Sequence, residues 1–162
     1  MNNIKYQFIV LTPQFISWPQ ATNVNDMINF AIRKYRIDTT RLYVCGLSMG
    51  GGTTWDDAAA YGKRLAAIVP ICGASAPTTQ NANSIAKSTV AVWAFHNNGD
   101  PTVPSWYSTD WVKDINGDNP SIRAKLTMFQ ADVHNAWAKA TDPNYKENGM
   151  NIYQWMLTYR KK

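Results

Sequence analysis

The sequence predicts an α/β fold: a parallel sheet of about five strands in three layers, flanked by helices. Short apolar runs rich in β-branched and aromatic residues recur along the chain, and segments with helical spacing of apolar residues separate them. Strands that alternate with helices in this way are typical of βαβ units and a parallel sheet. A length of 162 residues fits a single domain spanning residues 1–162.

The expected strands are apolar without strict alternation, as in strands covered on both faces. The last one alternates more, so we expect it nearer an edge. In chain order they are Gln7–Leu11, Arg41–Cys45, Ala66–Cys72, Val90–Phe95 and Ile122–Phe129.

The first expected helix begins after Asn23, a good N-cap residue, and carries apolar residues at helical spacing as far as Tyr35. Residues 76–88 are polar and predict a loop with a short helix. The other expected helices are Met49–Tyr61, which Gly62 ends, Pro104–Ile115 and Asn151–Tyr159.

Composition excludes several classes of protein. No apolar run approaches the ~18–20 residues of a membrane span, and the first residues lack the apolar region of a signal peptide. The net charge of +5 comes from scattered basic residues, which indicates a solvated surface and no nucleic-acid site.

Cys45 and Cys72 fall in apolar runs, so we expect free buried thiols, with a bridge between them as the alternative. The compartment stays open; secretion or a periplasmic location would require a signal upstream.

The strongest motif is G-x-S-x-G at residues 46–50, between an expected strand and an expected helix. A sharp strand-to-helix turn forces its serine, Ser48, into a strained conformation and exposes the hydroxyl. Side chains at Gly46 and Gly50 would collide across the turn. The N–H of Met49 would then face a developing oxyanion at the helix N-terminus.

Asp100 and His134 each follow a later strand, and ligands bind beyond the carboxyl ends of strands in such sheets. Asp100 would accept a hydrogen bond from the histidine and His134 would act as general base for Ser48. The alternatives are His96 as base and Asp132 as acid. Two further carboxylates near the motif, Asp56 and Asp57, are expected to be solvated.

The chain resembles the α/β-hydrolase superfamily, in particular its small-esterase branch of dienelactone-hydrolase-like, polyhydroxybutyrate-depolymerase-like, feruloyl and acetylxylan esterases. The resemblance implies Ser48 as nucleophile, Asp100 as acid and His134 as base. It rests on residues 12–14 with Trp18, residues 35–38 with 41–43, residues 46–51, residues 70–73, His96 with Asp100, Val103 and Pro104, and residues 134–137.

In the resembling family further strands precede the one expected at Gln7–Leu11, and one of them lies between it and Arg41–Cys45. The loop after that strand supplies a second oxyanion N–H. This chain therefore resembles an esterase without its N-terminal strands. Either Gln7–Leu11 pairs directly with Arg41–Cys45, or a second copy or a separate N-terminal segment supplies the strand; we expect the second.

The expected function is a serine carboxylesterase that acts through an acyl-enzyme on Ser48, without metal or organic cofactor. Its substrate would be a small-molecule or polysaccharide-linked ester, and Gln14, Trp18 and Trp137 are the candidate pocket residues. No membrane or nucleic-acid partner is expected. The alternatives are a peptidase of the prolyl-oligopeptidase type, and a weakly active or inactive fragment that needs a partner segment.

Overall fold

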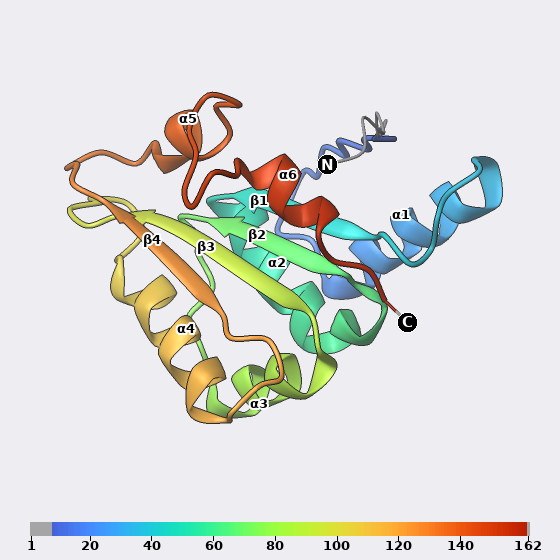
Figure 1. The fold of residues 1–162 in the computed structure, drawn as a ribbon, viewed down its shortest axis with the longest axis horizontal. Helices are drawn as coiled ribbons and strands as arrows, with labels where there is room; N and C mark the ends of the chain where they lie inside the picture. Colours follow the sequence, from blue (N-terminus) through green and yellow to red (C-terminus); the bar gives the residue numbers. More distant parts are fainter. Residues whose placement is uncertain (1–7, 162) are drawn as a thin grey trace.

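Four parallel strands form the sheet at the centre of the molecule. The computed structural model describes residues 8–161, and within them the strands follow one another in the order β1-β2-β3-β4 (Figure 1). Their bounds are Tyr43–Leu47 for β1, Ala67–Ile71 for β2, Ala91–Asn97 for β3 and Lys125–Phe129 for β4. The carboxyl ends of all four strands therefore lie at the same edge of the sheet.

Helices cover both faces of the sheet, as Figure 1 shows. On one face are α1 (Ala21–Lys34), α2 (Met49–Tyr61) with the short 3₁₀ turn η1 (Gly62–Arg64), α3 (Thr79–Ser88) and α4 (Trp106–Gly117). On the other face are α5 (Ala136–Ala140) and α6 (Ile152–Leu157). The expected three-layer α/β arrangement is thus present.

Alternating side chains of the strands build one core on each face of the sheet. Ile68 and Val92 point to the face on which Trp55 of α2 stacks on Trp111 of α4, with ring centroids 4.8 Å apart. Trp93 and its neighbours pack on the opposite face with α5 and α6. Burial of each large apolar side chain stabilises the fold by roughly 1.5–3 kcal/mol. The two cores hold the strand ends, and hence the site, in place.

The expected strand at Gln7–Leu11 is not formed. Gln7 lies outside the described residues, and residues 8–11 belong to no helix or strand and have no ladder partner. Val10 is 72% exposed, and β1 is an edge strand among the described residues. An extended segment becomes a strand only when a neighbouring strand satisfies its N–H and C=O groups. Direct pairing of this segment with β1 is therefore absent, and the sheet has four described strands instead of five.

Several helix boundaries differ from the expected ones. Helix α1 begins at Ala21, and Asn23 lies inside its first turn, where its Oδ1 accepts from the N–H of Gln20 at 2.8 Å. Helix α4 begins at Trp106 and continues through Gly117. In the polar stretch 76–88, where a loop with a short helix was expected, α3 takes up the last ten residues. The short helix α5 was not expected, because its five residues are too few for a periodic pattern.

The cysteines are both free. Cys72 is buried as expected, but Cys45 is exposed because it lies on the edge strand β1. Within residues 8–161, none of the helices is long and apolar enough to cross a membrane.

Candidate active site

Ser48 lies in a strained turn between β1 and α2. Its backbone has φ of 53° and ψ of −118°, in the left-handed half of φ space that few residues other than glycine adopt. Such a conformation costs on the order of 1–3 kcal/mol and persists only where the surroundings impose it. Here the N–H of Ser48 donates to the carbonyl of Ile71 at 2.9 Å, and its carbonyl accepts from Ala74 at 3.0 Å. The end of β2 therefore holds the turn.

The two glycines that flank this turn differ in whether a side chain would fit at their position. A Cβ on Gly46 would overlap the backbone carbonyl of Gly50, so the turn closes only with glycine at position 46. A Cβ on Gly50 would meet nothing within 4 Å. The expectation that Gly50 must lack a side chain is therefore wrong, because only one of the two positions faces the other across the turn.

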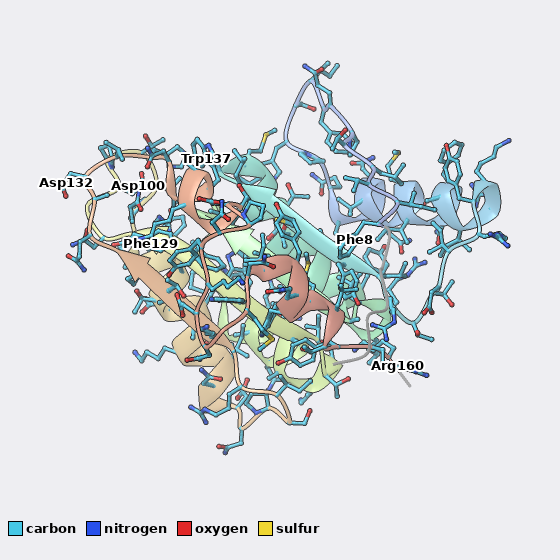
Figure 2. The ribbon with its side chains drawn as sticks, turned by 45° about the horizontal axis from the view of Figure 1, so that its top comes forward. Phe8, Asp100, Phe129, Asp132, Trp137 and Arg160 are labelled. Carbon is cyan, nitrogen blue, oxygen red and sulfur yellow. The ribbon has the colours of Figure 1, made fainter. Side chains whose placement is uncertain are left out.

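Asp100 and His134 form a short hydrogen bond at the carboxyl edge of the sheet. Asp100 lies in the loop after β3 and His134 in the loop after β4, and Nδ1 of His134 lies 2.6 Å from Oδ2 of Asp100. The carboxylate is fully buried and the imidazole 17% exposed. Figure 2 shows Asp100 at the same end of the molecule as Trp137, away from Phe8 and Arg160.

The carboxylate of Asp100 is held ionised by its hydrogen bonds. Burial opposes ionisation, but hydrogen bonds from His134, Val103 and Thr102 outweigh it, and the pKa of Asp100 lies below its ordinary value. Oδ1 accepts from the N–H groups of Thr102 at 2.8 Å and Val103 at 3.0 Å. An ionised partner fixes the tautomer of His134 with the proton on Nδ1 and stabilises its imidazolium form.

The other ring nitrogen of His134 is left available. Nε2 is shielded from solvent and has no hydrogen-bond partner among residues 8–161. It is therefore not bonded to the Ser48 hydroxyl in this structure. With the proton on Nδ1, Nε2 is a free acceptor, which is the state that a general base needs before it takes a proton.

His96, the alternative base, is fully buried with both ring nitrogens occupied. Nδ1 lies 2.7 Å from Oγ of Ser108, and Nε2 lies 3.1 Å from the carbonyl of Val103. Because a carbonyl only accepts, Nε2 carries the proton and the Ser108 hydroxyl donates to Nδ1. Burial also lowers the pKa of His96, so the ring is neutral. Through its bond to Val103, His96 stabilises the loop that carries Asp100, and neither of its ring nitrogens is free to act on Ser48.

Asp132, the alternative acid, is exposed and lies against Gly99. Figure 2 places it at the periphery of the molecule.

Asp56 and Asp57 were expected to be solvated, and the structure shows that they are not. Asp56 is half-buried and accepts from the Ser75 hydroxyl at 2.7 Å, and Asp57 is fully buried because its side of α2 faces the protein interior.

The three candidate pocket residues lie in different surroundings. The Trp137 ring packs edge-on against the His134 ring, with centroids 5.2 Å apart. Trp18 is 43% exposed and packs on Gly52 of α2, so it lies on the helix side of the turn. Gln14 is exposed in the segment before α1, which forms no helix or strand. Of the three, Trp137 is the residue that the fold brings to the histidine.

A thiol beside Asp100 was not foreseen as part of the site. Sγ of Cys72, a ring nitrogen of His96 and a carboxylate oxygen of Asp100 all lie within 4.8 Å of one another. These are residue types that bind zinc. However, both nitrogens of His96 and both oxygens of Asp100 already have protein partners, so the cluster is described better as a hydrogen-bonded group.

Comparisons with known proteins place this geometry in a family. A thermostable esterase of known structure is 26% identical, with a TM-score of 0.70 over 86% of this chain and 36% of its own. A protein described as a dienelactone hydrolase from Klebsiella pneumoniae subsp. pneumoniae is 17% identical, with a TM-score of 0.60 over 85% of this chain and 57% of its own. A puromycin-hydrolyzing peptidase from Mycobacterium tuberculosis is 15% identical, with a TM-score of 0.62 over 72% of this chain and 22% of its own.

The chain thus spans between about a fifth and three fifths of the length of these proteins. No curated protein matches the sequence. The sequence profile of the family described as Phospholipase/Carboxylesterase matches residues 18–142. That range includes the turn at Ser48, the Asp100 loop and His134, and the chain therefore belongs to the phospholipase/carboxylesterase family, in the small-esterase branch of the α/β-hydrolases.

Proposed function

We propose that the protein is a serine carboxylesterase with Ser48 as nucleophile, His134 as general base and Asp100 as the acid. The observation that carries the proposal is the buried 2.6 Å hydrogen bond between Asp100 and His134, with Nε2 of His134 left without a partner among the described residues. The strained turn that presents Ser48, at the same edge of the sheet, supports it. Family membership supports the class of reaction.

In the proposed mechanism Nε2 of His134 removes the proton of the Ser48 hydroxyl as Oγ attacks the ester carbonyl. The N–H of Met49, at the first position of α2, donates to the oxyanion that forms. The C–O bond to the alcohol then breaks, and the alcohol leaves with the proton from His134. A water molecule that gives its proton to His134 next attacks the acyl-serine, and the carboxylic acid leaves as Ser48 regains its proton.

We further propose that another strand covers the free edge of β1. Cys45 and Leu47 are exposed on β1, and residues 8–11 lie unpaired in the sheet's vicinity, with the Phe8 ring 6.1 Å from the Tyr43 ring. Open edges of this kind are templates for strand pairing. The strand would come from a second copy or from an N-terminal segment, and it would bring the second oxyanion donor beside Met49.

The proposed function is tested by measuring kcat for the hydrolysis of p-nitrophenyl acetate and p-nitrophenyl butyrate by the wild-type chain and by Ser48→Ala. If Met49 supplies the one oxyanion donor of the chain alone, kcat of the chain alone should be about 10²–10³ lower than with a second donor present. Addition of a peptide that pairs with the edge of β1 and carries the second donor should raise it. The proposal would be refuted if Ser48→Ala hydrolysed the esters as fast as the wild-type chain.

A peptidase is the alternative that the same triad permits. The resemblance to the mycobacterial peptidase shows the fold alone. A peptide p-nitroanilide, assayed beside the esters, separates the two activities. The carboxylesterase proposal predicts a higher kcat/KM for the ester, and the reverse order would favour the peptidase.

A further inference from the structure

Cys72 follows the last residue of β2 with its backbone in the left-handed region, at φ of 45°. A residue with a side chain is strained in this conformation, and such outliers cluster at functional sites. Its N–H donates to the carbonyl of Phe95 on β3 at 2.8 Å. Two residues later, the N–H of Ala74 donates to the carbonyl of Ser48. The strained residue therefore sits in the turn that joins the proposed nucleophile to the centre of the sheet.

The side chain of Cys72 is fully buried against the segments that carry the other two triad residues. Its Sγ lies within 4.8 Å of a carboxylate oxygen of Asp100. Burial, with the Asp100 carboxylate adding to it, raises the pKa of Cys72 to about 11, while hydrogen bonds from the backbone of Ala136 and Asn97 oppose the rise. The thiol thus keeps its proton at neutral pH. A thiol that keeps its proton is a donor, and a carboxylate is the acceptor beside it.

The acceptor sites of Asp100 leave room for such a donor. Oδ1 is taken by the N–H groups of Thr102 and Val103, and Oδ2 accepts Nδ1 of His134. A carboxylate oxygen accepts more than one hydrogen bond, so Oδ2 has capacity left. Nε2 of His96 lies 3.5 Å from Oδ2, but its N–H already donates to the carbonyl of Val103 at 3.1 Å.

We propose that Cys72 is a positioning residue of the triad, whose thiol donates a hydrogen bond to the carboxylate of Asp100 and fixes the orientation in which that carboxylate receives His134. This inference rests on the proposed triad. The end of β2 would thereby help to fix the orientation of the Asp100 carboxylate, which otherwise is set only by the loop that carries Asp100 and by His134.

The proposal differs from a packing role in what a serine would do at position 72. A hydroxyl is a stronger donor than a thiol but a poorer apolar filler, so serine keeps the hydrogen bond and alanine loses it. If Cys72 acts through the hydrogen bond, Cys72→Ser keeps kcat within a few-fold and Cys72→Ala loses about tenfold in kcat with KM unchanged. If it acts only by packing, serine is no better than alanine.

The direct test is the infrared S–H stretching band of the full chain. It is measured in Cys45→Ala, which leaves Cys72 as the single thiol; this variant is also the matched control in the kinetic comparison, because Cys45 is exposed on β1. The proposal predicts a band below the frequency of an unbonded thiol in an apolar solvent, and a shift back toward it in Asp100→Asn, whose neutral amide is a weaker acceptor.

The band needs no turnover, so an inactive chain still tests this inference apart from the proposed function. A band at the unbonded frequency overturns the proposal, whether or not any variant folds. Equal loss of kcat in Cys72→Ser and Cys72→Ala also overturns it. A low band with loss in the alanine variant alone supports it.

Discussion

Asp57 should make the protein less stable as pH rises, and its replacement should remove that dependence. Its carboxylate is fully buried on α2, and neither oxygen has a hydrogen-bond partner among the residues that the structure describes. Burial raises its pKa from 3.8 to about 7, although the charge of Arg64 opposes the rise. Nη1 of Arg64 donates to Asn25 and Asn29 of α1, and the guanidinium acts on the carboxylate through its charge, without a hydrogen bond to it.

The sign and size follow from proton linkage. Below pH 4 Asp57 is protonated in both the folded and unfolded states and has no effect. Between pH 4 and 7 the unfolded state loses its proton first, so the free energy of unfolding falls as pH rises. Above pH 7 both states are ionised and the loss is complete. A difference of roughly 3 pKa units corresponds to about 4 kcal/mol, a large part of the ~5–15 kcal/mol that stabilises a domain.

The assay is urea unfolding of the wild type and Asp57→Asn at pH 5, 6, 7 and 8, with linear extrapolation to water. The asparagine variant should be the more stable protein at pH 8, and its advantage should shrink toward pH 5. Asp26→Asn, which changes an exposed carboxylate on α1, is the matched control and should keep the wild-type pH dependence. Parallel pH curves for the wild type and Asp57→Asn would refute the reasoning.

Three further predictions follow from the site. Gly46→Ala should abolish ester hydrolysis and lower the melting temperature, because its Cβ meets backbone that cannot move aside, whereas Gly50→Ala should change the melting temperature little; similar melting curves would contradict this. His134→Ala should lower kcat about as much as loss of the nucleophile, on the order of 10⁶, and His96→Ala much less. An exchange of the two in severity would make His96 the base. Trp137→Ala should change KM, because its ring packs on the base; an unchanged KM would remove it from the site.

The order of the strands β1 to β4 and of most helices could be predicted from periodicity. β2 is apolar throughout and β3 is apolar from Ala91 to Phe95, and helices such as α1 carry apolar residues at helical spacing. The proposed site could be located for a related reason: in a parallel sheet, whatever follows the strands must gather at one edge, and Asp100 and His134 do. Gly46 was predicted correctly from the geometry of a sharp turn.

The remaining features depend on partners that a pattern does not reveal. Residues 8–11 have the composition of a strand but lack a described neighbour to pair with. Asp57 was expected in solvent because carboxylates are rarely buried without a partner. Only the packing of α2 shows that the Asp57 side chain is buried. The left-handed backbone of Cys72 has no signal in composition, since residues other than glycine rarely adopt it.

The central claim, that Ser48 is a nucleophile activated by His134, is tested most directly by covalent labelling with a fluorophosphonate. The protein, Ser48→Ala, His134→Ala and Ser84→Ala are treated at pH 7.5, and the labelled peptide is identified by mass spectrometry. Ser84 lies on α3, where its hydroxyl donates to the carbonyl of Gln80, and serves as the control serine. The account predicts a single label on Ser48, retained in Ser84→Ala, strongly slowed in His134→Ala and absent in Ser48→Ala. Labelling that persists at the wild-type rate in Ser48→Ala or His134→Ala would contradict it.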